Sequence, residues 1–189
     1  MWYNLSMLKI EMLNLETQPW FSDSDYMSII ADLINRQEVQ DLDTIIHHHI
    51  STRLQHSLRV SYVGYLNALS KGLDARACAR AGLLHDLFYF KPKDVSFKRG
   101  PKFVHPRVAL INARKLTHLS LIEEDIIVHH MWLTCSSTMF DMPRTKEGRL
   151  ISMVDKQVAQ FEARAMIKQK WNSRHKFQSL PNFSPVILK

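Results

Sequence analysis

The stretch that decides the fold is RLQHSLRVSYVGYLNALSKGLDARACARAGLLHDLF, residues 53–88. Leucine and tyrosine recur at helical spacing in its first half, which predicts a helix over about residues 52–70. Gly72 is suited to end that helix, and Asp74 is suited to cap a second helix over about residues 75–88. The stretch therefore predicts two consecutive helices joined by a tight turn.

The rest of the chain also has helical periodicity, so we predict an all-α fold. Residues 91–103 are predicted to form a loop, because prolines and a glycine interrupt them. Further helices are predicted over about residues 25–39, from His105-Pro106 onward, from the capping box Ser120-Leu-Ile-Glu123 to about His130, and over about residues 146–170. We expect three parts: a helical extension over 1–44 that packs on the core, a helical domain over 45–170, and a basic tail over 171–189.

The composition excludes several classes of protein. The chain has 189 residues, which suits one domain with appendages, and only two cysteines, Cys78 and Cys135, which cannot form a disulfide framework. Only five glycines are present, and none cluster as phosphate-binding loops require. No apolar run is long enough to span a membrane, and the N-terminus lacks a basic segment of the signal-peptide type. We therefore expect a cytoplasmic protein without a membrane partner.

The formal charge of +7 is concentrated in two segments. Residues 91–118 carry 8 basic and 1 acidic side chains, residues 164–189 carry 6 basic and none acidic, and the remainder is slightly acidic. The isoelectric point near 9.5 alone would favour nucleic acid. Because the charge is divided between two local patches, it does not by itself make nucleic acid the expected partner.

Several ionisable residues fall on apolar helix faces. His56, the pair His85-Asp86 and Asp155 each have apolar neighbours at helical spacing. Taken singly, a core histidine is usually hydrogen-bonded, and an aspartate often caps a helix or pairs with arginine. Together they indicate a metal site, since a buried carboxylate is costly unless a cation or a hydrogen-bond donor compensates it.

The ordered set resembles the HD-domain phosphohydrolase superfamily, whose pattern is H…HD…D on a helical scaffold. Residues 53–88 look like its first two motifs, and LISMVDKQVA, residues 150–159, looks like its last. The resemblance implies an HD-domain helical bundle over residues 45–170. It also implies one divalent metal, which would be iron, manganese, nickel, cobalt or zinc, with magnesium as a further candidate, and would be held by His56, His85, Asp86 and Asp155.

Some members of that superfamily add two histidines and bind a second metal. The contexts HPRVALINAR around His105 and IIVHHMW around His130 resemble those motifs. His130 is preferred to His129, because it shares the apolar face of Ile126 and Ile127. The alternative for His105 is a helix N-cap. The MWLT sequence departs from the HD-GYP signature, so cyclic dinucleotide cleavage is not expected, and a diadenosine polyphosphate substrate stays open.

The resemblance implies hydrolysis of a phosphoester or phosphoanhydride, in a nucleotide-type small molecule, by a metal-activated water. Asp86 and His85 would carry the catalysis. Candidate substrate-binding cations are Lys91, Lys93, Arg53 and Lys156, each with the alternative of being an ordinary structural or solvated charge.

Other functions and arrangements remain open from the sequence. The alternative functions are a catalytically quiet nucleotide-binding regulator, a nucleic-acid phosphodiesterase that uses the basic tail, and a di-iron oxygenase. The apolar residues 1–21 pack on the domain or form a homodimer contact. The histidine run at 47–49 is interpreted as a solvated turn, with His49 as a candidate to reach the mouth of the site.

Overall fold

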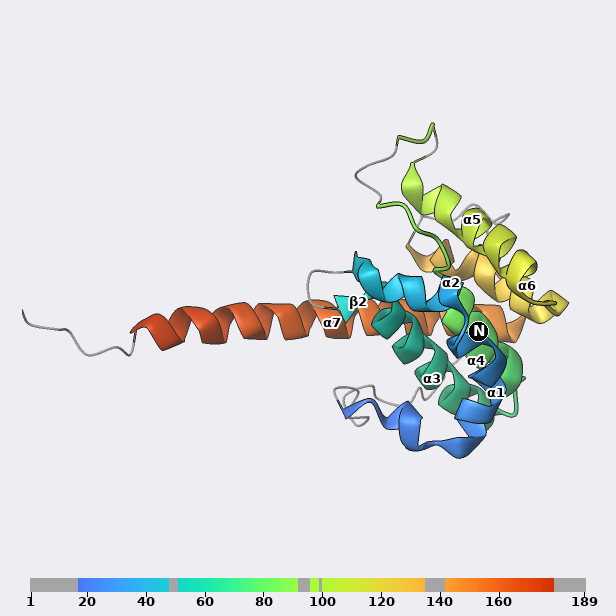
Figure 1. The fold of residues 1–189 in the computed structure, drawn as a ribbon, viewed down its shortest axis with the longest axis horizontal. Helices are drawn as coiled ribbons and strands as arrows, with labels where there is room; N and C mark the ends of the chain where they lie inside the picture. Colours follow the sequence, from blue (N-terminus) through green and yellow to red (C-terminus); the bar gives the residue numbers. More distant parts are fainter. Residues whose placement is uncertain (1–16, 48–50, 92–95, 99, 135–141, 179–189) are drawn as a thin grey trace, which may run out of the picture.

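Helices α3 (Arg53–Lys71) and α4 (Ala75–Leu84) form the centre of a helical fold in the computed structural model (Figure 1). The structure describes residues 17–47, 51–91, 96–98, 100–134 and 142–178. The all-α prediction is confirmed, since the strands in this part of the chain form just a two-stranded antiparallel hairpin. The other elements are η3 (Pro19–Ser22), α1 (Ser24–Ile34), α2 (Gln37–Gln40), η4 (Asp41–Thr44), β1 (Ile46–His47), β2 (Ser51–Thr52), α5 (Pro101–Leu116), α6 (Leu121–His129), η5 (His130–Leu133) and α7 (Lys146–Gln178).

The ends of α3 follow from local chemistry, and its end at Gly72 was predicted. Thr52 and Gln55 form a reciprocal capping box at its start. Gly72 ends it with φ of 61°, in the left-handed region that glycine occupies without strain. The Asp74 side chain then accepts a hydrogen bond from the amide of Ala77 and caps α4.

Helix α4 ends four residues earlier than predicted. After Leu84 the backbone leaves the helix in tight turns, in which the Leu87 amide donates to the Leu84 carbonyl and the Phe88 amide donates to the Asp86 carbonyl. His85 and Asp86 therefore stand at the C-terminal end of α4, in a buried turn rather than inside a helix.

Two other helix boundaries also differ from prediction. The first helix ends at Ile34, and the short α2 follows it. Helix α5 begins at Pro101, because Gly100 with φ of 80° precedes a proline suited to the first helical position. His105 therefore lies inside a helix, and its alternative as an N-cap is wrong.

The last helix, α7, is longer than predicted. It continues through Gln178, so the first eight residues of the segment predicted as a tail are helical. Figure 1 shows the C-terminal part of α7 running well beyond the other helices, and Ile167 and Trp171 are exposed there. None of the described helices has both the length and the apolar character that crossing a bilayer requires.

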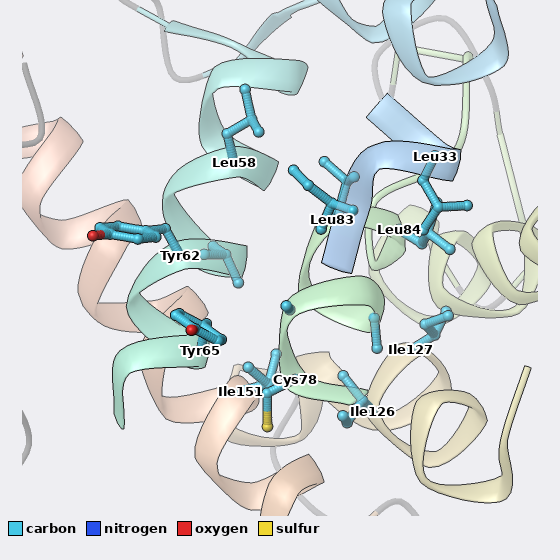
Figure 2. Close-up of a cluster of buried hydrophobic side chains, with 14 of the residues drawn as sticks. Leu33, Leu58, Tyr62, Tyr65, Cys78, Leu83, Leu84, Ile126, Ile127 and Ile151 are labelled. Carbon is cyan, nitrogen blue, oxygen red and sulfur yellow. The ribbon is translucent and has the colours of Figure 1, made fainter. Parts of the chain in front are cut away.

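One hydrophobic core joins the helices. Figure 2 shows side chains from α1, α3, α4, α6 and α7 meeting around α4. Trp20 and Tyr26 from the N-terminal elements are fully buried in the same core, and the Tyr26 hydroxyl donates a 2.7 Å hydrogen bond to Ser61. Ser61 in turn donates to the Ala79 carbonyl at 2.5 Å, which ties α3 to α4.

The close approach of α3 and α4 yields a test of the fold. A Cβ at Gly82 would lie 2.7 Å from the Ser61 Cα, whereas a Cβ at Gly64 would meet the tip of the Ile151 side chain. Because a backbone atom cannot move aside, we expect Gly82→Ala to lower the free energy of unfolding by about 1–3 kcal/mol.

Gly64→Ala is the matched control in urea denaturation. The Ile151 tip can rotate, and alanine gains about 0.8–1.0 kcal/mol of helix propensity over glycine. We therefore expect the control to stay close to wild type. Equal stability of the two variants would contradict the packing described for α3 and α4.

Candidate metal centre

His56 is clamped between two buried carboxylates. Its Nε2 lies 3.0 Å from Asp155 Oδ1, and its Nδ1 lies 3.1 Å from Glu162 Oε2. Arg59 donates a 2.6 Å hydrogen bond to the other oxygen of Glu162. Burial opposes the charged imidazole, but the hydrogen bonds to Asp155 and Glu162 outweigh it and raise the pKa of His56 to about 10.

The turn after α4 turns His85 and Asp86 toward this clamp. His85 Nδ1 lies 2.8 Å from the Gly82 carbonyl, so Nδ1 carries the proton and donates it. His85 Nε2 faces the two aspartates, 3.8 Å from Asp155 Oδ1 and 4.0 Å from Asp86 Oδ2.

Two polar atoms at this point are buried without a hydrogen-bond partner, namely His85 Nε2 and Asp86 Oδ1. A buried polar group that lacks a partner costs about 1–3 kcal/mol. One is an imidazole nitrogen and the other a carboxylate oxygen, and both atom types are common metal ligands. Divalent cations bound here would satisfy these atoms, and so the donor set fits metal binding.

His105 from α5 and His130 from η5 approach the Oδ1 oxygen of Asp86. Their Nε2 atoms lie 3.3 Å and 3.6 Å from Asp86 Oδ1 and 2.9 Å from each other. His130 Nδ1 donates to the Ile127 carbonyl at 2.8 Å, and burial lowers the pKa of His130 to about 3. His130 is therefore neutral, with Nε2 as an acceptor, while the neighbouring His129 contacts Asp125 instead.

The imidazoles also govern the charge of the two aspartates. Burial alone would raise the pKa of Asp86, but the electrostatic influence of the surrounding imidazoles, His85 and His105 foremost, outweighs it and holds that pKa well below its usual range. Burial likewise opposes ionisation of Asp155, yet the His56 hydrogen bond and the nearby imidazoles lower its pKa to about 2. Both carboxylates are therefore ionised at neutral pH, as metal ligands must be.

The structure thus brings together all six residues expected to bind metal, from α3, the turn after α4, α5, η5 and α7. Among the described residues, three sets could each hold a metal ion. Within a set, every residue offers one potential ligand atom, and these atoms lie within 4.8 Å of one another. These sets are His47 with His56 and Asp86, His56 with His85 and Asp155, and His85 with Asp86 and His130.

Three of the four expected substrate-binding cations lie in the part of the chain that the structure describes. Lys91 is exposed, and Lys156 is exposed beside the buried Asp155. Arg53 is buried, with its guanidinium 3.6 Å from the centroid of the Phe88 ring and a hydrogen bond to the Phe88 carbonyl. Lys93 and His49 lie outside the described residues.

Two residues at the centre were missed from the sequence. Glu162 follows Asp155 by seven residues, which is two helical turns, so the shared face of α7 was a usable signal. His47 belongs to the histidine run interpreted as a solvated turn, but its ring centroid lies 4.4 Å from that of His56. Helical spacing gave no signal for His47, because a hairpin brings it there.

The raised pKa of His56 predicts a pH dependence of stability for the metal-free protein. His56 binds its proton more tightly in the folded state, since its pKa moves from 6.5 to about 10. The resulting stabilisation is complete below pH 6.5 and is lost as the pH rises toward 10. Urea denaturation in EDTA should therefore show a falling free energy of unfolding over this range.

Glu162→Gln is the comparison that isolates His56. It removes one of the carboxylates that raise the pKa of His56, so the stability gap between wild type and variant should shrink as the pH rises from 6 to 9.5. A gap that stays constant with pH would contradict a protonated His56 in the metal-free protein.

Comparison with known proteins agrees with this geometry. A family model described as HD domain matches residues 53–159, from the first residue of α3 to the middle of α7. No curated protein and no solved structure matches the chain. The matched region contains all six residues of the cluster and more than half of the chain, and the chain therefore belongs to the HD-domain family.

Proposed function

We propose that the protein is a metal-dependent phosphohydrolase that cleaves a phosphoester or phosphoanhydride in a nucleotide-type small molecule. The observation that carries this proposal is the arrangement of three buried histidines. His56, His85 and His130 each engage Nδ1 with a carboxylate or a backbone carbonyl and direct Nε2 toward an aspartate. Metal-ligating histidines are held in this way, with the second nitrogen bonded to fix ring orientation.

In this proposal Asp86 would be a ligand of both metals. Its Oδ2 is on the side of His85, and its Oδ1 is on the side of His105 and His130. One metal would be held by His56, His85, Asp86 and Asp155, and a second by Asp86, His105 and His130. Imidazole and carboxylate donors suit iron, manganese, nickel, cobalt or zinc better than magnesium.

A bound divalent metal lowers the pKa of a coordinated water to near neutrality and polarises a phosphoryl oxygen. The chain itself orients the site. Glu162 fixes the His56 ring and is fixed in turn by Arg59, while the Gly82 and Ile127 carbonyls fix His85 and His130. Because these contacts are made inside the core, the donors are held in place before substrate binds.

The substrate would approach from the least buried side of the centre. The side chains of Asp155 and His105 are 13% and 11% exposed, whereas those of His56, His85 and His130 are each 1% exposed. Lys91, five residues after Asp86, would add positive charge near this side for a phosphate group. Arg53, already held by Phe88, would act mainly by fixing the turn that carries Asp86.

The experiment is a hydrolysis assay on purified full-length protein with each divalent metal. The substrates are mononucleotides, dinucleoside polyphosphates, bis(4-nitrophenyl) phosphate and a short RNA. We expect turnover of a nucleotide or phosphoanhydride that EDTA abolishes, and about a 10³-fold fall in kcat for Asp86→Asn, since the metals would lose their shared ligand.

Glu124→Gln is the matched control, because it also changes a carboxylate to an amide but lies in a surface ion pair with Arg114. It should retain wild-type turnover. The proposal fails if metal-loaded protein turns over none of the substrates. Tight nucleotide binding without turnover would then identify a regulator, and cleavage of RNA alone would identify a nucleic-acid phosphodiesterase.

A further inference from the structure

His47 reaches the metal centre from an element that supplies none of the six expected ligands. It lies in β1, and its ring packs against the His56 ring with centroids 4.4 Å apart and planes inclined at 35°. A ligand nitrogen of His47, one of His56 and a carboxylate oxygen of Asp86 lie within 4.8 Å of one another. His47 therefore stands beside two of the residues proposed to hold the first metal.

The hairpin fixes the backbone of His47 relative to α3. His47 pairs with Ser51 in the β1–β2 ladder, and the Ser51 hydroxyl donates to the His47 carbonyl at 3.3 Å. The Arg53 amide donates to the Ile45 carbonyl at 2.8 Å, so the residue just before β1 is tied to the first turn of α3. His56 lies on that same helix, one turn further on. The position of His47 beside His56 is thus set by main-chain hydrogen bonds.

We propose that His47 is a fifth protein ligand of the metal held by His56, His85, Asp86 and Asp155, an inference that rests on the metal centre of the proposed function. Ligands bonded at about 2.1 Å to one ion lie no more than about 4.2 Å apart. A small adjustment of the His47 ring, which is only half-buried, brings its nitrogen into that range. The rings of His56, His85 and His130 are fully buried in the core and cannot adjust in this way.

A fifth ligand also changes which metals the site accepts. Three imidazoles and two carboxylates favour a transition metal over magnesium, because magnesium prefers oxygen ligands. Loss of His47 should therefore weaken Co²⁺ binding far more than Mg²⁺ binding. It should also leave a coordination position to solvent, which alters the visible absorption of bound Co²⁺.

The test compares His47→Ala, His47→Phe and wild type as full-length, metal-free proteins titrated with Co²⁺. The phenylalanine variant keeps a ring against His56 but has no ligating nitrogen, so it separates coordination from packing. We expect both variants to bind Co²⁺ at least about tenfold more weakly and to change its absorption spectrum. His118→Ala, at an exposed histidine, is the control and should bind Co²⁺ like wild type.

Two results would overturn the inference. One is wild-type Co²⁺ affinity in His47→Phe, which would assign His47 a packing role. The other is an unchanged Co²⁺ spectrum in both variants. If the alanine variant does not fold in EDTA, as judged by circular dichroism, the Co²⁺ affinity and spectrum of the phenylalanine variant alone test the inference.

The result of the Co²⁺-binding test can be distinguished from the result of the hydrolysis assay that tests the proposed function. Weakened Co²⁺ binding in both variants supports His47 as a ligand even if wild-type protein hydrolyses no substrate. Hydrolysis by wild type together with unchanged Co²⁺ binding in the variants overturns the role of His47 and leaves the proposed function standing.

Discussion

The interior of this protein must accommodate two ionised aspartates, and the rest of the structure depends on how their charge is balanced. Asp86 and Asp155 are buried where an unpaired carboxylate would cost several kcal/mol. Histidines from α3, the turn after α4, α5 and η5 surround them, and hydrogen bonding from His56 together with the charge of neighbouring imidazoles keeps the pKa of each aspartate low. The helices are thus arranged around a centre of charge as well as around a hydrophobic core.

Much of this arrangement could be predicted, because helix-capping residues and helical periodicity in the sequence encode it. The capping box at Ser120 and the helix stop at Gly72 are encoded by neighbouring residues, and both were identified from the sequence, whereas the capping box at Thr52 was not. The ordered set of His56, His85-Asp86 and Asp155 stood out for a similar reason, since ionisable residues on apolar helix faces are unusual. The structure brings these residues together, and the family match covers them.

The predictions were wrong or incomplete where contacts between distant parts of the chain determine the helix boundaries and the position of a residue. His105-Pro106 looked like a helix start, but Gly100 and Pro101 begin α5 earlier, and His105 turns toward Asp86 from inside the helix. Helix α4 ends early because its last residues form the turn that buries the HD pair. His47 gave no periodic signal, since a two-stranded hairpin places it. Such long-range placement cannot be inferred from the spacing of residues along one helix.

The central claim is that the convergent donors form a metal centre, and anomalous X-ray diffraction from crystals grown with Mn²⁺ tests it most directly. The account predicts an anomalous-difference peak enclosed by His56, His85, Asp86 and Asp155, within about 2.0–2.3 Å of their ligand atoms. A fully ordered site without such a peak, with manganese bound only at surface carboxylates, would contradict it.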